Sequence, residues 1–216
     1  MKFLLLLILN LGLALAAPAQ EEPASYLGNL VSRATEFVSD FFSEYDEPAY
    51  KVVRTIGDSQ VEERKYPGGL AWACTDEENA ANGDENIFWR LFQYIQGQNE
   101  GGVKIAMTTP VKMERFPGEK GERNMCFYLK PYTDQEPPAP TNAKISIVRS
   151  PEMNIYTRRV GGYMDDADWD YEFNSLKTFL KANNVADFNE DKYYANGYDS
   201  PMMFYNRRNE VWVTKE

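Results

Sequence analysis

The stretch YKVVRTIGDSQVEERKYPGG, residues 50–69, returns in altered form as KISIVRSPEMNIYTRRVGG at residues 144–162. Val53-Arg54-Thr55 lies 95 residues before Val148-Arg149-Ser150, and both stretches end in a Gly-Gly pair. Each stretch has the composition of two short strands separated by a turn. A chain that repeats itself in this way is expected to contain two similar structural units.

Both copies continue with the same order of patterns. Helical periodicity follows at ENIFWRLFQYIQG (85–97) and at DWDYEFNSLKTFLKANN (168–184). A small residue, a proline and a methionine then precede a strand, in KIAMTTPVKMERF (104–116) and in GYDSPMMFYNRRNEVWV (197–213). The sequence therefore predicts a strand-strand-helix-strand-strand unit, present twice.

Two such units define an α+β fold, in which a distorted antiparallel sheet or barrel is flanked by two helices. We expect one domain over residues 48–216, with repeat halves at about 48–133 and 144–216. The proline-rich segment 134–143 between them is expected to be an extended surface connection. A groove should form where the halves meet, and binding sites often lie at such junctions.

The N-terminus has the pattern of a secretory signal peptide. Residues 1–16 combine Lys2 with an apolar run and small residues at the end, and cleavage could fall as late as residue 19. The segment 17–47 contains an amphipathic helix at residues 25–45 with an acidic polar face, which favours packing on the domain or against a partner over binding to a membrane. No other stretch is long and apolar enough to span a membrane.

The chain contains no histidine. This excludes Ser-His-Asp and Cys-His catalysis, zinc sites built on histidine, and haem ligation by a proximal histidine. The formal net charge of −10, which becomes −11 once Lys2 is removed, disfavours nucleic acid as a partner. Carboxylates are the remaining catalytic candidates.

The acidic cluster Asp165, Asp166, Asp168 and Asp170 does not have the ligand spacing of a calcium-binding EF-hand loop. Its place at the start of a helix predicts capping of free backbone N–H groups instead.

Cys74 and Cys126 are the two cysteines. In an oxidising compartment they are expected to form one disulfide, the alternative being two buried free thiols. Each lies in an apolar, strand-like segment, LAWAC and MCFYL, and these two strands could pair with each other. We therefore predict the disulfide.

Methionines flank the two proline turns, Thr109-Pro110 and Ser200-Pro201, which the repeat would bring to equivalent places in the two halves. They fill irregular gaps in the core or line a groove for a large, flat, apolar ligand. In the second case Arg90, Arg207 or Arg208 could bind acidic groups of the ligand, although strand alternation allows only one of the last two to point into the groove. The methionines concerned are Met107, Met113, Met202 and Met203.

Five segments, in this order and spacing, resemble the SOUL/haem-binding-protein family, with details typical of its haem-binding protein 2 branch. The resemblance covers residues 48–216 and implies the same α+β fold of two repeats. The segments are VEERKYPGGLAWA (61–73), FWRLFQYIQGQNE (88–100), IAMTTPV (105–111), EPPAPTNA (136–143) and GYDSPMMFYNRRNEVWV (197–213).

The resemblance implies binding of haem or another tetrapyrrole in a shallow hydrophobic groove near the first helix and the C-terminal Pro-Met turn. The chain departs from the family pattern because it lacks the histidine proposed as axial ligand in some members, and because Met203 replaces a residue that is basic in some relatives. Weak, non-covalent binding is therefore expected. The matching residues are Phe88, Arg90, Leu91 and Tyr94 on the helix and Met202, Met203 and Tyr205 at the turn.

The fold also resembles bacterial effector-binding domains, some of which hydrolyse ligands with a glutamate in the groove, and this resemblance implies Glu62, Glu63 or Glu114 for that role. On alternating strands we expect these glutamates to face solvent, so we predict that the protein is not an enzyme. The sequence thus predicts a secreted carrier or scavenger of haem, without histidine ligation. The alternative is a protein-interaction module on the same fold that does not bind haem physiologically, with a partner or a second copy docking on the helix at residues 25–45. The signal segment predicts secretion, with the lumen of lysosomes or vesicles as the other possible destination.

Overall fold

The structure, a computed structural model, describes residues 45–57, 61–76, 87–119, 124–200, 203 and 205–216. The predictions for the signal peptide and for almost all of the helix at residues 25–45 concern residues outside these ranges. Within them no helix is long and apolar enough to cross a membrane. The main elements are β1 (Lys51–Ile56), β2 (Val61–Tyr66), β3 (Ala71–Asp76), α3 (Ile87–Ile95), β4 (Val111–Arg115), β5 (Asn124–Tyr128), β6 (Ser146–Arg149), β7 (Met153–Val160), α4 (Asp166–Ala182), β8 (Tyr193–Gly197) and β9 (Asn209–Thr214).

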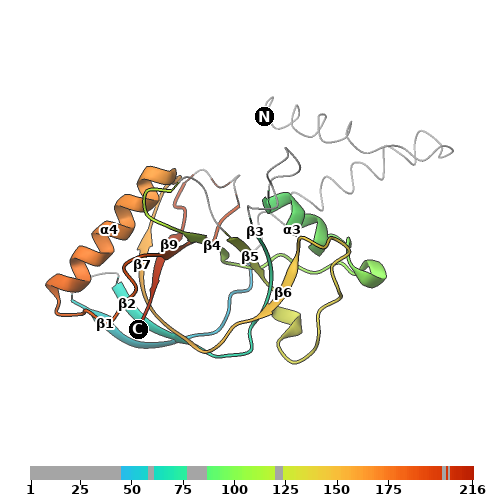
Figure 1. The fold of residues 1–216 in the computed structure, drawn as a ribbon, viewed down its shortest axis with the longest axis horizontal. Coiled ribbons are helices and arrows are strands. Elements are labelled where there is room, and N and C mark those ends of the chain that lie inside the picture. Colours follow the sequence, from blue (N-terminus) through green and yellow to red (C-terminus); the bar gives the residue numbers. More distant parts are fainter. Residues whose placement is uncertain (1–44, 58–60, 77–86, 120–123, 201–202, 204) are drawn as a thin grey trace. The chain divides into compact units, whose positions relative to one another are not determined.

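The described strands form one antiparallel sheet in the order β1-β2-β7-β9-β8-β4-β5-β3-β6, accompanied by two α-helices (Figure 1). The order is symmetric about the β8·β4 pair. It relates β9 to β5, β7 to β3 and β6 to β2, so that β2-β3-α3-β4-β5 and β6-β7-α4-β8-β9 are the two copies. The predicted α+β fold of two strand-strand-helix-strand-strand units is confirmed. The sheet has edges at β1 and β6 and is not closed into a barrel.

The repeat lies one strand further along the first half than the sequence echo suggested. The echo aligned residues 50–69 with residues 144–162, and therefore β1 with β6. In the sheet, β2 and β3 match β6 and β7, while β1 is an additional edge strand. The two Gly-Gly pairs are not equivalent either, because Gly68-Gly69 joins β2 to β3 whereas Gly161-Gly162 follows β7.

The prediction that the two proline turns occupy equivalent places is also wrong. Thr109-Pro110 comes just before β4, but Ser200 comes after β8, in the connection to β9. The turns are nevertheless neighbours, because β4 and β8 are antiparallel and Val111 at the start of β4 pairs with Gly197 at the end of β8. Both turns therefore lie at the same end of the sheet.

The two helices cover one face of the sheet, and each has a core cluster beneath it. Under α3, the cluster includes Leu91 and Phe127; under α4, it includes Phe173, which stacks on Tyr193 of β8 with ring centroids 4.5 Å apart. The predicted capping at the start of α4 is confirmed, because the backbone N–H of Asp168 donates to the carboxylate of Asp165 at 2.9 Å.

The other face of the sheet holds a third cluster, which includes Tyr66, Trp72 and Trp212. This face is curved because β2-β3 and β6-β7 form one bent two-stranded ribbon. Backbone hydrogen bonds from Gly69 to Ser150 and from Ser150 to Leu70, 2.8 and 2.9 Å long, continue the pairing of β2 with β7 into that of β3 with β6. We call this helix-free surface the inner face.

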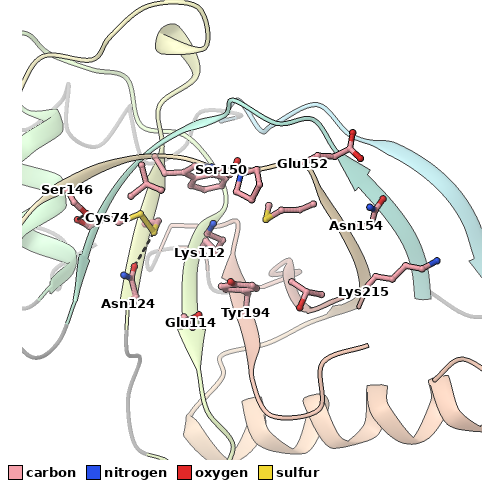
Figure 2. Close-up of a pocket in the computed structure, with 16 residues that line it drawn as sticks. Cys74, Lys112, Glu114, Asn124, Ser146, Ser150, Glu152, Asn154, Tyr194 and Lys215 are labelled. Atoms are coloured by element: carbon pink, nitrogen blue, oxygen red, sulfur yellow. Dashed lines mark hydrogen bonds between the residues drawn. A yellow bond between two sulfur atoms is a disulfide. The ribbon is translucent and has the colours of Figure 1, made fainter. Parts of the chain in front are cut away.

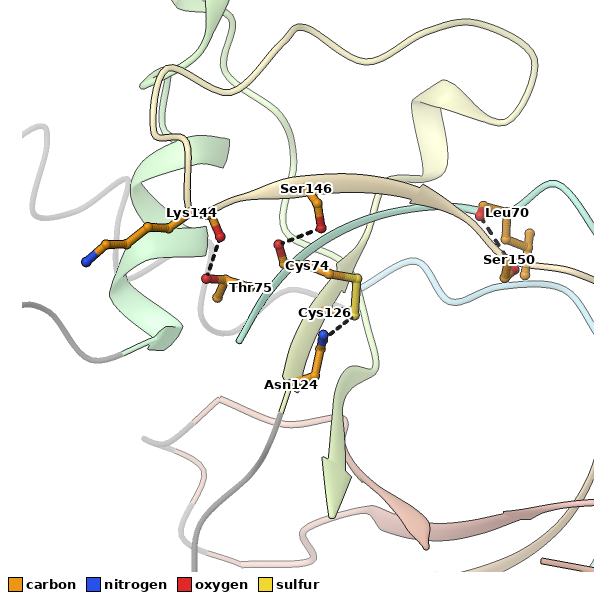
Figure 3. The surroundings of a disulfide bond; sticks show 8 residues. All are labelled: Leu70, Cys74, Thr75, Asn124, Cys126, Lys144, Ser146 and Ser150. Carbon is orange, nitrogen blue, oxygen red and sulfur yellow. Dashed lines mark hydrogen bonds between the residues drawn. A yellow bond between two sulfur atoms is a disulfide. The ribbon is translucent and has the colours of Figure 1, made fainter. Parts of the chain in front are cut away.

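Cys74 and Cys126 lie directly opposite each other on β3 and β5 and form the predicted disulfide (Figure 3). Their Cα atoms are 4.1 Å apart. Strand alternation places both side chains on the inner face, next to Trp72. The bond therefore closes a loop that contains α3, β4 and the connections between β3 and β5.

Candidate functional site

Helix α3 contributes four of the residues predicted to bind a ligand, and most of them face the sheet. Leu91 and Tyr94 have no exposed surface and belong to the core beneath the helix. The Tyr94 hydroxyl donates to the carbonyl of Pro138 at 2.9 Å, so the proline-rich connection packs over this helix. Phe88 is half-buried, with its ring centroid 5.3 Å from that of Phe127.

Arg90 is buried, with 1% of its surface exposed. Its Nη1 atom donates to the hydroxyl of Thr75 at 2.5 Å and to the carbonyl of Asp76 at 3.3 Å. These contacts direct the guanidinium toward the end of β3. Arg90 therefore ties α3 to the sheet.

The outward side of α3 is also aromatic, which the sequence analysis missed. Trp89 is 42% exposed, and its ring makes edge contacts with Phe88 and Phe92 at centroid distances of 5.7 and 5.4 Å. Phe88 and Phe92 stack at 6.0 Å. We call these three residues the α3 aromatic face. The signal was present in IFWRLFQYI, which is apolar on more than one side of the helix, whereas a surface helix normally carries polar residues there.

The remaining predicted residues belong to the β8–β9 connection. Met203 is half-buried, Tyr205 is 79% exposed, and Met202 lies outside the described residues. The carbonyl of Met203 accepts hydrogen bonds from the Tyr163 hydroxyl at 3.2 Å and from Arg207 Nη1 at 3.0 Å. The predicted residues thus lie on two elements, α3 and this connection.

The start of β4 links these two elements. Val111 and Met107 both pack against the core under α3, as do Phe88 and Phe92. Val111 also pairs with Gly197, three residues before Ser200. The start of β4 therefore lies between the core under α3 and the end of β8, where the β8–β9 connection begins.

Arg207 and Arg208 have different environments. Arg208 forms ion pairs with Glu47 at 3.1 Å and Glu210 at 2.8 Å, so its charge is already compensated. Arg207 donates to the carbonyls of Ser200 and Met203 and lies 4.5 Å from the ring centroid of Tyr163. Among the described residues it has no carboxylate partner, so Arg207 is the one of the two that remains able to bind an acidic group.

A second candidate site lies on the inner face of the sheet (Figure 2). It is a cavity of about 480 Å³, a size typical of sites for small molecules. Trp72, Tyr194, Val148 and Met153 form its apolar walls, and the disulfide borders it. Because α3 packs on the opposite face of β3 and β5, we treat this inner pocket as separate from the α3 aromatic face.

Lys112 is the central polar residue of the inner pocket. Figure 2 shows its side chain extending from β4 into the concave side of the sheet. Its ammonium nitrogen is 4.1 Å from the ring centroid of Trp72 and 5.3 Å from that of Tyr194. Burial lowers the pKa of Lys112 to about 8, against a smaller opposing effect of Glu114.

The three glutamates considered as catalytic candidates are all in ion pairs. Glu62 binds Arg64 and Glu114 binds Lys192, each at 2.7 Å. The expectation that all three face solvent is wrong for Glu63, which is buried between the cations Arg54 and Lys215. It is also wrong for Glu114, whose strand faces the inner pocket because the sheet is curved.

Within the described ranges, no group of three or more histidine, cysteine, aspartate or glutamate side chains is arranged to hold a metal ion.

Comparison with known proteins identifies the domain. The family model described as "SOUL heme-binding protein" matches residues 45–214. "Heme-binding protein 1" of Mus musculus is 30% identical over 82% of this chain and 96% of its own length. "Heme-binding protein 2" of Homo sapiens is 30% identical over 71% of this chain and 78% of its own. Both branches of the family are thus similar to this chain.

Two solved structures show more distant similarity. The C-terminal domain of EcmrR is 12% identical and aligns with a TM-score of 0.48, over 74% of this chain and 99% of that domain. A putative transcription regulation protein from Staphylococcus aureus is 9% identical and aligns with a TM-score of 0.40, over 79% of this chain and 99% of that protein.

Proposed function

The chain belongs to the SOUL heme-binding protein family, and from that premise we propose that it binds haem or a closely related tetrapyrrole. The family match over residues 45–214 is the observation that carries the proposal. The binding is non-covalent and does not use a histidine ligand, because the chain has none. Haem brings the iron chemistry when it binds, and the protein contributes an apolar surface and charge.

The α3 aromatic face and the β8–β9 connection fit such a ligand. Trp89 and Tyr205 expose large aromatic surfaces, and a flat macrocycle can stack on rings of this kind. Met107 and Val111, half-buried at the start of β4, add apolar surface next to the core under α3. Fully buried Leu91 and Tyr94 act by holding α3 in place rather than by touching the ligand.

Arg207 is the residue best placed to bind the acidic groups of the tetrapyrrole. Its guanidinium is held by carbonyl groups of the β8–β9 connection, and no carboxylate among the described residues neutralises it. Arg90 is only 1% exposed and therefore out of reach of a surface ligand, and Arg208 is already paired with Glu47 and Glu210. One cation and a shallow aromatic surface support weak rather than tight binding.

We further propose that the protein is secreted and acts as a carrier or scavenger. The signal-peptide pattern at residues 1–16 supports export. The disulfide between Cys74 and Cys126 also supports an oxidising compartment, since disulfides are rare in reducing ones. Delivery to a lysosomal or vesicular lumen would also agree with the signal-peptide pattern and the disulfide.

A haemin titration of the chain without its signal segment, residues 17–216, tests the proposal. Soret absorbance is followed with and without competing albumin, for the wild type and for Trp89→Ala and Met203→Glu. Saturation near one equivalent is expected, with weaker binding in both variants. Tyr171→Ala is the control, since Tyr171 is an aromatic residue on α4 that is 70% exposed.

Unchanged affinity in both variants would reject the proposed surface. A broad, unsaturating change that albumin removes would reject haem binding altogether. That second result would favour the alternative, in which the domain is a protein-interaction module, and a pull-down with and without residues 25–45 would then be the next experiment.

A further inference from the structure

We propose that the inner pocket is a second binding site, for a small amphipathic monocarboxylate whose carboxylate pairs with Lys112 and whose apolar part packs between Trp72 and Tyr194. The site lies on the face of the sheet opposite the α3 aromatic face. It is therefore independent of the proposed haem surface, and each proposal can fail without the other.

The charge balance of the pocket argues for an anionic ligand. Three other charged residues line it, and each has a partner of opposite charge: Glu114 pairs with Lys192 at 2.7 Å, Glu152 with Lys65 at 2.6 Å, and Lys215 with Glu63 at 2.7 Å. Lys112 has no hydrogen-bond or ion-pair partner in the part of the chain that the structure describes. It is the one uncompensated charge of the pocket lining.

The ammonium group is held in a poorly solvated position. Its close neighbours are the faces of Trp72 and Tyr194, which attract a cation but do not neutralise it. Burial accordingly lowers the pKa of Lys112 to about 8, so the group is still mainly charged at neutral pH. By its exposed surface Lys112 is half-buried, between two aromatic rings. A poorly solvated charge without a partner disfavours the folded state, and a bound carboxylate would reduce this penalty.

Trp72 provides a second unsatisfied donor at the same place. Its side chain is 1% exposed and its indole N–H has no acceptor among the described residues. Buried donors are normally paired with protein or water. By contrast, the other buried tryptophan of the inner face, Trp212, donates to Glu210 at 2.8 Å. The indole N–H of Trp72 is therefore a local reporter for a ligand that packs on its ring.

The side chains that line the inner pocket determine which apolar group the ligand can carry. Trp72, Tyr194, Val148 and Met153 offer aromatic and aliphatic surface, which suits an aryl or short alkyl group. The carboxylates of Glu114 and Glu152 disfavour a second negative charge on the ligand. An aromatic or short-chain aliphatic monocarboxylic acid is therefore the class that fits.

The binding should depend on pH in a way that identifies Lys112. The affinity is expected to fall as the pH rises through about 8, because deprotonation of Lys112 removes the positive charge. The other titratable groups facing it are Glu114, Glu152, Lys215 and Tyr194. The first three are ion-paired, and burial raises the pKa of Tyr194, so it stays neutral in this range.

The test uses 4-phenylbutyrate as the probe and its neutral amide, 4-phenylbutyramide, as the matched ligand. Binding to the signal-free chain is followed by calorimetry and by the NMR signal of the Trp72 indole N–H. We expect saturable binding of the acid, at least about tenfold weaker binding of the amide, and a similar loss in Lys112→Met. Lys112→Arg should retain binding and lose the dependence on pH near 8.

Lys177→Met is the matched control variant, because Lys177 also lies over an aromatic ring, that of Phe173 at 4.6 Å, but on the helix-covered side of the sheet. It should bind 4-phenylbutyrate like the wild type. The proposal is overturned if the acid does not saturate the protein at millimolar concentration, if acid and amide bind alike, or if Lys112→Met binds unchanged. Retained haemin binding in Lys112→Met would confirm that the two sites are separate.

Discussion

Arg64 of β2 and Glu210 of β9 form a buried ion pair, with Nη1 2.9 Å from Oε2, although 146 residues of sequence separate them and β7 lies between their strands. Glu210 also accepts hydrogen bonds from Arg208, from the Trp212 indole and from the Tyr198 hydroxyl. The Glu210 carboxylate thus connects β2 of the first repeat half with β9 and with both ends of the β8–β9 connection.

Replacing this carboxylate should destabilise the domain strongly. Glu210→Gln removes the buried carboxylate that Arg64 and Arg208 share and leaves each with one more exposed partner, Glu62 and Glu47. Removing one partner of a buried ion pair typically costs about 3–5 kcal/mol. Urea unfolding at pH 7 measures the loss. Glu136→Gln is the control, because Glu136 is largely exposed and should change the free energy of unfolding by less than about 0.5 kcal/mol. Equal effects of the two changes would contradict the assigned role.

The Arg64–Glu210 ion pair also predicts how the stability of the domain changes at acidic pH. Burial acts to raise the pKa of Glu210, but Arg64 and Arg208 outweigh it, so the pKa lies below the ordinary value of 4.5. Because the folded-state pKa is lowered, the stabilisation is present above pH 4.5 and is lost as the pH falls below it. The difference in unfolding free energy between wild type and Glu210→Gln should therefore shrink on acidification from pH 5 downward. A difference that stays constant to pH 3 would show that Glu210 does not titrate with folding.

The disulfide should contribute to stability without determining the fold. Cys74 and Cys126 close a loop of about 50 residues, and the double variant Cys74→Ala/Cys126→Ala should lose about 2–4 kcal/mol. The pairing of β3 with β5 supplies the register independently, so the far-UV circular dichroism should be preserved. Chemical unfolding with and without reductant checks this, and the double variant should not respond to reductant.

Truncating side chains to alanine on the two sides of α3 should affect different properties of the protein. Leu91→Ala removes a fully buried side chain and should cost about 2–5 kcal/mol of stability. Trp89→Ala removes a side chain that is 42% exposed, so it should have little effect on stability but weaken haemin binding. Thermal unfolding and the Soret titration, run on both variants, separate the two effects. Loss of stability in Trp89→Ala comparable to that in Leu91→Ala would contradict the description of the α3 aromatic face.

The sequence predicted the features that depend on local pattern. The helices expected at residues 85–97 and 168–184 are observed at Ile87–Ile95 and Asp166–Ala182. Asp165 caps the second helix, and the segments around Cys74 and Cys126 pair as strands. These outcomes follow from periodicity, from capping chemistry and from the apolar character of strands.

The inner pocket could not be predicted because it depends on sheet curvature. In VKMER, alternation separates Val111 and Met113 from Lys112 and Glu114, and the charged pair looks like a solvent-facing side. The bend of the β2-β3 and β6-β7 ribbon turns that side into a cavity. The sequence echo misplaced the repeat for a related reason, since β1 and β2 resemble a strand pair of the repeat but only strand pairing shows that β1 is extra.

The unpaired charge of Lys112 predicts that removing it stabilises the unliganded protein. Lys112→Met keeps the length of the side chain and its contact with Trp72, and eliminates a poorly solvated cation. The free energy of unfolding at pH 7 should rise by about 1–3 kcal/mol. Lys177→Met, which removes a half-buried lysine of α4 on the other face of the sheet, should change the free energy of unfolding little.

The dependence on pH distinguishes loss of charge from better packing. The pKa of Lys112 is lowered to about 8 in the folded state from 10.5, so the unfolded chain binds more protons between these values and the wild type gains stability as the pH rises through that range. The advantage of Lys112→Met should therefore be full below pH 8 and should shrink toward pH 10.5. If the difference in unfolding free energy between Lys112→Met and wild type did not change with pH, it would come from better packing of Met. The charge of Lys112 would then not destabilise the folded state, and a carboxylate ligand would have no such cost to remove.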